Sequence, residues 1–520
     1  MRIQRTKNAT RNVAIGIALK IYQMVGPFIL RTVMIYVLGM QYLGLNSLFT
    51  SILQVLNLAE LGVGSAMVYS MYRPIAEDDT VQICSLMKLY KTYYRVIGLV
   101  ILVVGVAITP EIPQLISGDA PADINVYVLY LLNLGATVLS YWLFAYKNSL
   151  LTAHQRTDVI DKVTIGTTTF QYILQIAVLL VFKSYYLYII VALATQALLN
   201  IVTSQVVDKM YPVYKPSGKI DKELAKQINK KVKDLFTSKI GEVIVNSADT
   251  IVISAFLGLT MLAMYNNYYY ILTAVMGFIT IIFKATTAGI GNSIVVESEQ
   301  KNYMDLKKLT FMISWIGCFC TCCLLCLYQP FMELWVGQKY MLSFGCVICL
   351  CVYFYTRVIN QVLIVYKDAA GMWHEDRFRP LCTALTNLAL NLATVKFLGI
   401  YGILLSTVIS TLVVGMPWVI KNIFTVIFHM SATEFIRNLL VYVTSGAAIC
   451  TLTYVGCEFI SINLIATIVI RLVVCCFVPN ILYVILFRRT DEFKQTIAIA
   501  DSVIGKKIPF AHKVLSRLRG

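Results

Sequence analysis

The stretch at residues 28–39, FILRTVMIYVLG, is an apolar run of helical length interrupted by a single arginine, Arg31. The apolar residues continue on its N-terminal side, so the whole segment is long enough to cross about 30 Å of hydrocarbon. A guanidinium facing lipid at mid-depth costs roughly 2.5–3.5 kcal/mol, so Arg31 is expected to face a wet cavity or a partner side chain. The stretch therefore predicts a transmembrane helix with one polar face.

The composition of the whole chain points the same way. Of its 520 residues, 58% are hydrophobic and 14% are charged, and the mean hydropathy is +0.73. Soluble domains have about half apolar and about a quarter charged residues, and one soluble core could not bury this much apolar surface. The sequence therefore predicts an all-α polytopic membrane protein. The first apolar segment exceeds a signal-peptide core of about 7–15 residues, so we expect it to be retained as a transmembrane helix.

Apolar length and polar breaks divide the chain into fourteen predicted transmembrane helices. Their ranges are 12–38, 45–70, 86–109, 124–147, 159–182, 184–207, 230–257, 263–291, 307–332, 341–366, 380–398, 400–424, 434–456 and 459–487. With both termini in the cytoplasm, the outer loops and their margins contain only three basic residues, Lys183, Lys339 and Lys396. This bias favours fourteen spans with cytoplasmic ends.

The two halves of the chain match at a nearly constant offset. Leu38-Gly39 and Leu257-Gly258 are 219 residues apart, and matches at offsets of 219 or 220 recur in order along the sequence. The other pairs are Lys20 and Lys239, Glu77 and Glu297, Lys88 and Lys308, Pro110 and Pro330, Lys147 and Lys367, and His154 and His374. We therefore expect two six-helix bundles related by a pseudo-two-fold axis along the membrane normal, with a central cavity between them.

This repeat predicts a domain organisation for the whole chain. The expected parts are an N-lobe at 1–207, a basic amphipathic linker at 208–229, a C-lobe at 230–425, an extra helix pair at 426–487 and a basic cytoplasmic tail at 488–520. The linker and the tail are expected to bind anionic lipid headgroups or a cytoplasmic partner. Nucleic acid is not indicated, because the net charge of +17 mostly reflects the inward bias of basic residues.

Basic residues outnumber acidic ones inside the predicted helices, which favours an anionic substrate because Arg and Lys suit phosphate. The residues expected to line the cavity are Lys20, Arg31, Lys239, Lys284 and Arg357. Two more intramembrane arginines, Arg95 and Arg471, are expected to snorkel or to contact lipid or a neighbouring helix. Coupling or gating roles are assigned to Glu60, Glu242 and Asp249, which could bind a proton or a sodium ion.

Arg31 and Asp249 lie at similar depths on repeat-equivalent helices, so we expect them to be in contact. Two readings of that contact remain open. It is either a permanent ion pair that holds the lobes together or a gate that yields to an anionic substrate.

The sequence offers no pattern for covalent chemistry. It contains neither a phosphate-binding loop of the Gly-x4-Gly-Lys-Ser/Thr type nor a His/Asp/Ser constellation, and we expect a secondary transporter without a cofactor. The fourteen cysteines crowd into apolar runs such as CFCTCCLLC at 318–326. Packing as small apolar residues is one interpretation of these cysteines, and a metal or redox role is the alternative.

The segments VLGMQYLGLNSLF at 37–49 and FLGLTMLAMYNNYYYIL at 256–272, with the duplicated bundle, resemble Wzx-type polysaccharide flippases of the MOP exporter superfamily. The resemblance implies alternating access and transfer of an undecaprenyl-pyrophosphate-linked oligosaccharide, such as an O-antigen unit, to the outer leaflet. It also implies contact with membrane lipids and with a polysaccharide polymerase complex. Charged cavity residues in helices 1, 2, 7 and 8 are a family feature, which here matches Arg31, Glu60, Asp249 and Lys284.

Three other functions remain open at this point. A lipid II flippase shares the fourteen helices and an anionic substrate. A MATE-type cation or drug antiporter shares the fold but would require an acid-rich cavity. A scaffold that does not transport would not need the intramembrane charges. The identity of the glycan, the coupling ion and the oligomeric state are not encoded in any pattern of this sequence.

Overall fold

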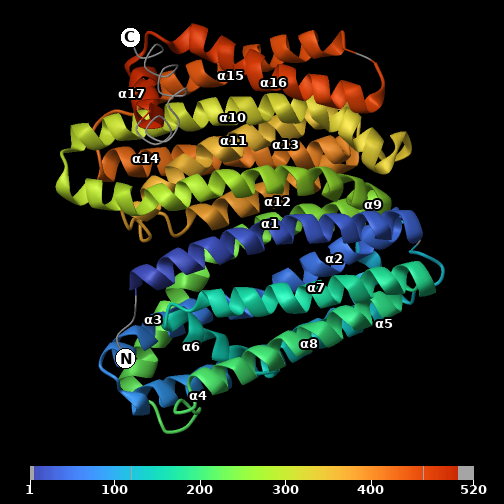
Figure 1. Cartoon of the computed structure of the whole chain (residues 1–520), viewed down its shortest axis with the longest axis vertical. Helices are drawn as coiled ribbons and strands as arrows, with labels where there is room; N and C mark the ends of the chain where they lie inside the picture. Colours follow the sequence, from blue (N-terminus) through green and yellow to red (C-terminus); the bar gives the residue numbers. More distant parts are fainter. Residues whose placement is uncertain (1–4, 119, 461, 502–520) are drawn as a thin grey trace. The chain divides into compact units, whose positions relative to one another are not determined.

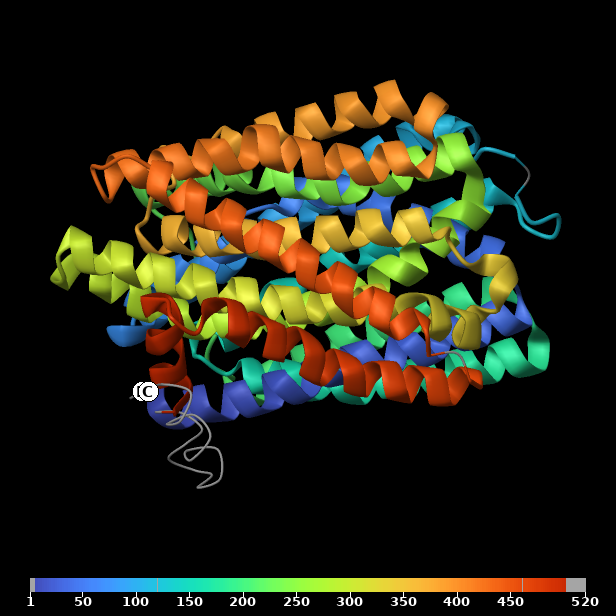
Figure 2. The same ribbon diagram turned by 90° about the horizontal axis from the view of Figure 1, so that it is seen from above.

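The computed structural model describes residues 5–118, 120–460 and 462–501. Side chains are not described at 5–14, 17, 234, 237–239, 242, 246, 284, 285 and 288. The chain divides into two compact units, residues 1–263 and 264–520, and each consists mainly of long helices that run side by side (Figures 1 and 2). The predicted lobe boundaries at 207 and 230 stay a prediction.

The first unit is built from helix pairs in which α1 packs on α7, α7 on α8, α8 on α5 and α5 on α4. Its elements are α1 (Arg5–Val37), α2 (Met40–Leu56), η1 (Asn57–Glu60), α3 (Val63–Ala76), α4 (Thr80–Ala107), η2 (Thr109–Leu115), α5 (Val126–Trp142), η3 (Ala145–Lys147), α6 (Asn148–Ala153), α7 (Thr157–Phe182), α8 (Tyr185–Met210) and the beginning of α9 (Lys222–Val296).

The second unit is organised around α10, which packs against α11, α15, α16 and α17. Its elements after α9 are α10 (Glu299–Val336), η4 (Gln338–Tyr340), α11 (Phe344–Ala369), α12 (Arg379–Leu398), α13 (Ile400–Ser410), the π-helical turn η5 (Thr411–Gly415), α14 (Met416–Val426), α15 (Thr433–Glu458), α16 (Leu464–Phe487) and α17 (Asp491–Ala500).

Each of the fourteen predicted ranges overlaps a helix of the structure. Among the described residues, twelve helices are long and apolar enough to span a membrane, or thirteen if α5 and the bent segment after it form one span. α9 counts once in that number, although its 75 residues far exceed the ~20 needed for one crossing. Gly258 interrupts it with φ 86° and ψ 171°, between the ranges predicted for helices 7 and 8. The all-α polytopic fold is confirmed.

The internal repeat is visible in local backbone conformation. Gly39 has φ 110° and ψ 174°, close to the values at its repeat equivalent Gly258. Gly118 and Gly337, also 219 residues apart, have φ 80° and 78°. A residue with a side chain rarely adopts such angles, so glycine stands at equivalent turns of the backbone in the two halves.

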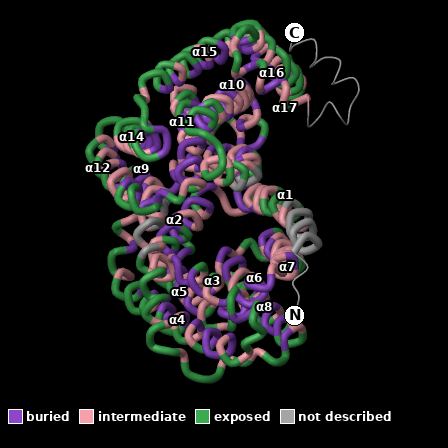
Figure 3. Tube along the Cα trace, turned by 90° about the vertical axis from the view of Figure 1, so that its left-hand side faces the viewer, coloured by how far each residue is buried: buried purple, intermediate pink, exposed green. Residues whose placement is uncertain are grey.

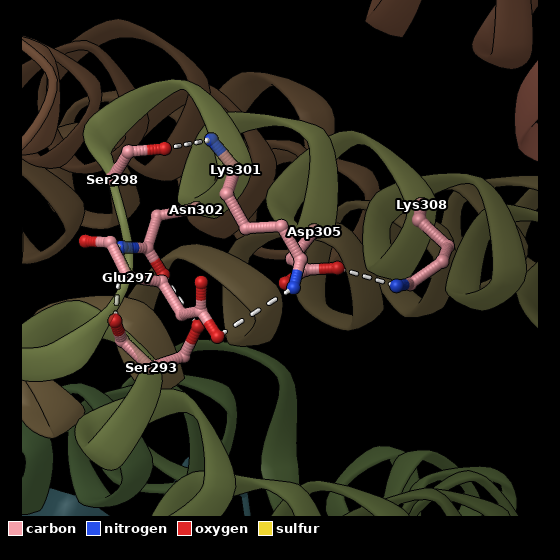
Figure 4. Close-up of polar contacts among 7 residues, drawn as sticks. All are labelled: Ser293, Glu297, Ser298, Lys301, Asn302, Asp305 and Lys308. Atoms are coloured by element: carbon pink, nitrogen blue, oxygen red, sulfur yellow. Dashed lines mark hydrogen bonds and ion pairs between the residues drawn. The ribbon is translucent and has the colours of Figure 1, made fainter.

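The third and ninth predicted helices also begin in the same way. Asp79 accepts a hydrogen bond from the backbone N–H of Gln82 at the start of α4. Its repeat equivalent Ser298 accepts one from Lys301 at the start of α10, and Lys301 also pairs with Glu297 (Figure 4). Side-chain N-caps of this kind are worth about 1 kcal/mol, which explains why both helices start at these positions.

Burial is distributed as expected for helices in a lipid solvent. α10 carries many buried residues, whereas α15 exposes one side along its length (Figure 3). α16 has a mean hydropathy of 2.4 in its most apolar window, yet only 17% of that window is buried. An apolar helix surface with no protein cover is the signature of contact with lipid, so the chain is a multi-pass membrane protein.

Candidate functional site

The second predicted helix is broken where its polar residues lie. It begins as α2, passes through a 3-10 turn at Asn57–Glu60 and resumes as α3 after Gly62, whose φ is 87°. Irregular backbone at membrane depth is tolerated where it is buried in protein or lines a cavity. The sequence predicted a continuous helix at 45–70 and missed this break, for which Gly62 was the available signal.

Glu60 is the acidic residue at the break, and its carboxylate is half-buried. The hydroxyl of Tyr94 donates to Glu60 Oε1 at 2.9 Å, and the hydroxyl of Tyr90 donates to that of Tyr94 at 2.6 Å. Both tyrosines come from α4 and are buried. The result is a chain of hydroxyls that ends on a carboxylate within the first unit.

A cavity of about 570 Å³ opens at this carboxylate. Its lining includes Glu60, Gly64, Tyr69, Tyr90 and Asn148, from the broken helix, α4 and α6. A methyl group at Gly64 would lie 3.1 Å from the Tyr90 hydroxyl and 3.4 Å from Glu60 Oε1, so the glycine keeps the carboxylate accessible. An intramembrane carboxylate that borders a cavity can exchange a proton or bind a small cation.

The last residue of the linker, Asn229, and the α9 residues directly after it lie against the same helices. Lys231 places its ammonium 4.0 Å from the ring centroid of Tyr69, and Tyr93 donates to Asn229 at 2.6 Å. A β-carbon added at Gly62 would be 2.6 Å from the β-carbon of Leu235, which shows how closely the start of α9 approaches the break. The end of the linker and the residues that follow it in α9 therefore contact the elements that form the Glu60 cavity. The predicted binding of the linker to lipid headgroups stays a prediction.

The second unit contains a different polar group, built around Arg357 of α11. Arg357 Nη1 donates to the Tyr353 hydroxyl at 2.6 Å, and that hydroxyl lies 3.3 Å from the hydroxyl of Tyr269. Asn360 follows one turn after Arg357, and its buried Oδ1 has no hydrogen-bond partner among the described residues. Arg357, Tyr353 and Asn360 share one face of α11 at helical spacing, and the first two are joined by a hydrogen bond. This Arg357 cluster presents a cation beside aromatic hydroxyls and an unsatisfied amide oxygen.

The tyrosines between residues 265 and 270 have two kinds of surroundings, the buried core and the Arg357 cluster. Tyr268 is fully buried, donates to Gln329 at 2.9 Å and accepts from the backbone N–H of Leu342 at 3.2 Å. Tyr265 stacks on Tyr269 with ring centroids 5.5 Å apart, which extends the Arg357 cluster. Tyr268 is therefore a core residue, whereas Tyr269 belongs to the polar cluster.

The remaining predicted residues have varied surroundings. Arg31 is half-buried on α1, where Tyr188 of α8 is an electrostatic neighbour, and Asp249 is half-buried on α9. Their mutual contact stays a prediction. Lys20 is exposed on α1. The side chains of Lys239, Glu242 and Lys284 lie outside the described residues.

Two of the remaining intramembrane arginines are also placed by the structure. Arg471 donates to the backbone carbonyls of Cys326 and Ile460, at 3.3 Å each, so it contacts a neighbouring helix as one of its two expected roles. Arg95 is exposed on α4, and its backbone carbonyl accepts from the indole of Trp142.

Sequence reasoning missed two buried lysines that the repeat relates. Lys147 Nζ lies 2.6 Å from Asp208 and 2.7 Å from the hydroxyl of Ser204. Its equivalent Lys367 lies 2.7 Å from Asp368 and 3.2 Å from Asp376. Both lysines stood in the repeat pattern, but an offset between halves carries no information on burial. Each is a structural ion pair near the end of its helix.

Comparisons with known proteins identify the class of fold. No family model matches the chain, and no curated protein sequence matches it. Solved structures do match over most of its length, among them transporters of the MOP superfamily. The chain is a multi-pass membrane protein with the fold of these transporters.

Two of these structures describe the likeness. The lipid II flippase MurJ, in an inward closed conformation, superposes with a TM-score of 0.69 at 14% identity, covering 92% of this chain and 99% of MurJ. An inward-facing multidrug resistance transporter of the MATE family superposes with a TM-score of 0.59 at 15% identity, covering 77% of this chain and 93% of the other. At such identities the likeness concerns the fold.

Proposed function

We propose that the protein is a flippase that moves an undecaprenyl-pyrophosphate-linked oligosaccharide from the cytoplasmic to the outer leaflet by alternating access. The cluster of Arg357, Tyr353 and Tyr269 carries the proposal. A guanidinium within the membrane attracts a pyrophosphate, and tyrosine hydroxyls and rings suit sugars. The likeness of fold to a lipid II flippase and the excess of intramembrane basic residues support it.

Glu60 supplies the coupling in this proposal. Its carboxylate takes up a proton or a sodium ion in the cavity of the first unit, and the hydroxyls of Tyr94 and Tyr90 provide a polar path to it. If the ion binds the inward-facing and outward-facing conformations with different affinities, it shifts the equilibrium between them. The size of that shift is limited by the difference in affinity. The protein acts in the bacterial cytoplasmic membrane with both termini inside, next to the polymerase complex that uses its product.

Lipid II is the second candidate substrate, because the MurJ structure covers nearly the whole of both chains. It shares the polyprenyl pyrophosphate, so Arg357 serves either substrate. The two candidates differ only in the sugar part. The drug antiporter is less well supported, since the cationic cluster would repel a cationic drug.

The test measures which leaflet holds each lipid-linked substrate in a strain that lacks this protein. We expect the undecaprenyl-linked oligosaccharide to accumulate on the cytoplasmic side and the wild-type protein to restore its transfer. Lipid II that is trapped inside and released by the protein would replace the oligosaccharide with lipid II as substrate. Normal leaflet distributions of both lipids, in a strain with no paralogue, would reject the flippase.

A further inference from the structure

Cysteines from three helices of the second unit converge into two compact groups. One group consists of Cys318 and Cys322 of α10 with Cys450 of α15. The other, called here the Arg471-side group, consists of Cys326, Cys457 and Cys475 from α10, α15 and α16. All six are buried, and within each group the three sulfurs lie within 4.8 Å of one another. Three sulfurs from different helices at this spacing are arranged as the ligands of one metal ion would be.

The first group has the character of packed thiols. Its three cysteines share a core with Phe311, Tyr442 and other buried aromatic side chains. The thiol of Cys318 points to the carbonyl of Gly446 at 3.9 Å, and that of Cys450 to the carbonyl of Cys318 at 4.0 Å. The thiol of Cys475 makes the same kind of contact, 3.8 Å from the carbonyl of Cys322, so this contact does not distinguish the two groups. What sets the first group apart is its apolar, aromatic surrounding, which favours neutral thiols.

The Arg471-side group differs from the first because a positive charge stands beside it. Arg471 lies one turn before Cys475 on the same face of α16, and its guanidinium bonds the carbonyl of Cys326 on α10. Its half-buried side chain has one nitrogen, Nε, that is buried and without a hydrogen-bond partner among the described residues. Three thiolates, one divalent cation and one guanidinium sum to zero charge, which removes most of the cost of burying ions in the membrane.

The geometry suits a thiophilic cation. Zinc binds thiolate sulfur at about 2.3 Å, so tetrahedral angles place coordinating sulfurs roughly 3.8 Å apart. The three sulfurs lie at most 4.8 Å from one another. Side-chain rotations that move the sulfurs by about 1 Å or less bring them to the coordinating spacing. Cys323 packs against the group as a partly buried neighbour.

We propose that Cys326, Cys457 and Cys475 form a binding site for a thiophilic divalent d10 cation, zinc or its analogues, with Arg471 as the charge-balancing residue. Binding converts three thiols to thiolates and releases three protons to water, without any change in oxidation state. The site ties α10, α15 and α16 together, outside both the Glu60 cavity and the Arg357 cluster. It is independent of the proposed flippase activity.

The test uses the full-length protein in nanodiscs, reduced and freed of metal, titrated with Cd²⁺. We expect one equivalent to bind with a thiolate-to-cadmium absorption band and release of up to three protons, and X-ray absorption of the wild type to show a sulfur-only shell. Cys475→Ser and Cys457→Ser remove the band. Cys476→Ser, the exposed neighbour of Cys475, and Cys450→Ser, from the other group, keep it. Arg471→Gln weakens binding by roughly tenfold.

Three results would overturn the site. Wild-type protein without a cadmium band has no such site. A band lost in Cys450→Ser and kept in Cys475→Ser places the cation in the other group. A site that binds Cu⁺ but not Cd²⁺ would contradict the proposal, because the charge balance with three thiolates and Arg471 requires a divalent cation. The sulfur shell measured on the wild type decides the question even where a serine variant fails to fold.

Discussion

The broken second helix of the first unit and its repeat equivalent in the second unit have the same place in the repeat but opposite character. In the first unit the break holds Glu60, bonded to Tyr94. The offset of 219 or 220 leads to Ile279 and Thr280, in an uninterrupted helical part of α9. One repeat therefore has a carboxylate at a break in the helix, where the other has Ile279 and Thr280 in continuous helix.

Around the Arg357 cluster, it is the second unit that carries the charged side chain and the first unit that does not. Arg357 and Tyr353 of the second unit correspond to Thr137 and Asn133 of α5, which bond carbonyls of their own helix. The acidic site is thus built in the first unit and the basic site in the second. The glycine turns and helix starts are alike in the two halves, whereas the side chains of these two polar groups differ.

The largest effect is expected from Arg357→Gln, which removes the cation of the basic site. Hydrogen bonds to charged groups contribute about 1.5–3 kcal/mol, so transfer of the lipid-linked substrate should fall roughly 10–100-fold. The leaflet assay measures this, with Arg95→Gln as the control because Arg95 is exposed on α4. Equal transfer by both variants would remove Arg357 from the substrate site.

Glu60→Gln is expected to abolish the dependence of transfer on the ion gradient while the protein still folds. The neutral amide keeps the size of the side chain but cannot exchange a proton. Transfer in vesicles with and without an imposed proton or sodium gradient gives the readout, and Tyr94→Phe should weaken the response less. Undiminished gradient dependence in the Gln variant would place the coupling elsewhere, for example at Asp249.

Gly62→Ala should destabilise the first unit by about 1–3 kcal/mol, since alanine is strained at φ 87° and its methyl would press on Leu235. The matched control is Gly166→Ala in α7, where a β-carbon meets nothing within 4 Å and helix propensity favours alanine. Thermal unfolding in detergent compares the two. A neutral Gly62→Ala would mean that the break does not depend on its glycine.

The smallest effect concerns His154 and its repeat equivalent His374. Burial lowers the pKa of His154 below its ordinary value, opposed by the hydrogen bond between its Nδ1 and the carbonyl of Leu150. Because the unfolded chain then takes up the proton first, stability should decrease as the pH falls below about 6.5 towards the folded-state pKa. His154→Gln should flatten this dependence, and His374→Gln, at an exposed position, should not. Unfolding midpoints between pH 5 and 8 decide it; identical slopes in both variants would contradict the prediction.

Most of the fold could be predicted from the sequence. Apolar length located the helices because a membrane requires every backbone group to be bonded within its own helix. The offset of 219 or 220 predicted the repeat that Gly39, Gly118, Gly258 and Gly337 now show in their backbone angles. The break at Asn57–Glu60 was not predicted, because a 3-10 turn in the middle of an apolar segment leaves the overall apolar length unchanged.

From the sequence alone, the positions and the polar residues of the helices could be predicted, because these depend on local composition and on the thickness of a bilayer. Which polar groups meet follows only from the packing of the helices. Glu60 meets Tyr94, 34 residues away, and Lys147 meets Asp208, 61 residues away. Such pairs depend on how each helix is rotated about its axis and at what depth it packs against its neighbours. The apolar pattern of the sequence fixes neither, because the surfaces that face lipid and those that face protein are both apolar.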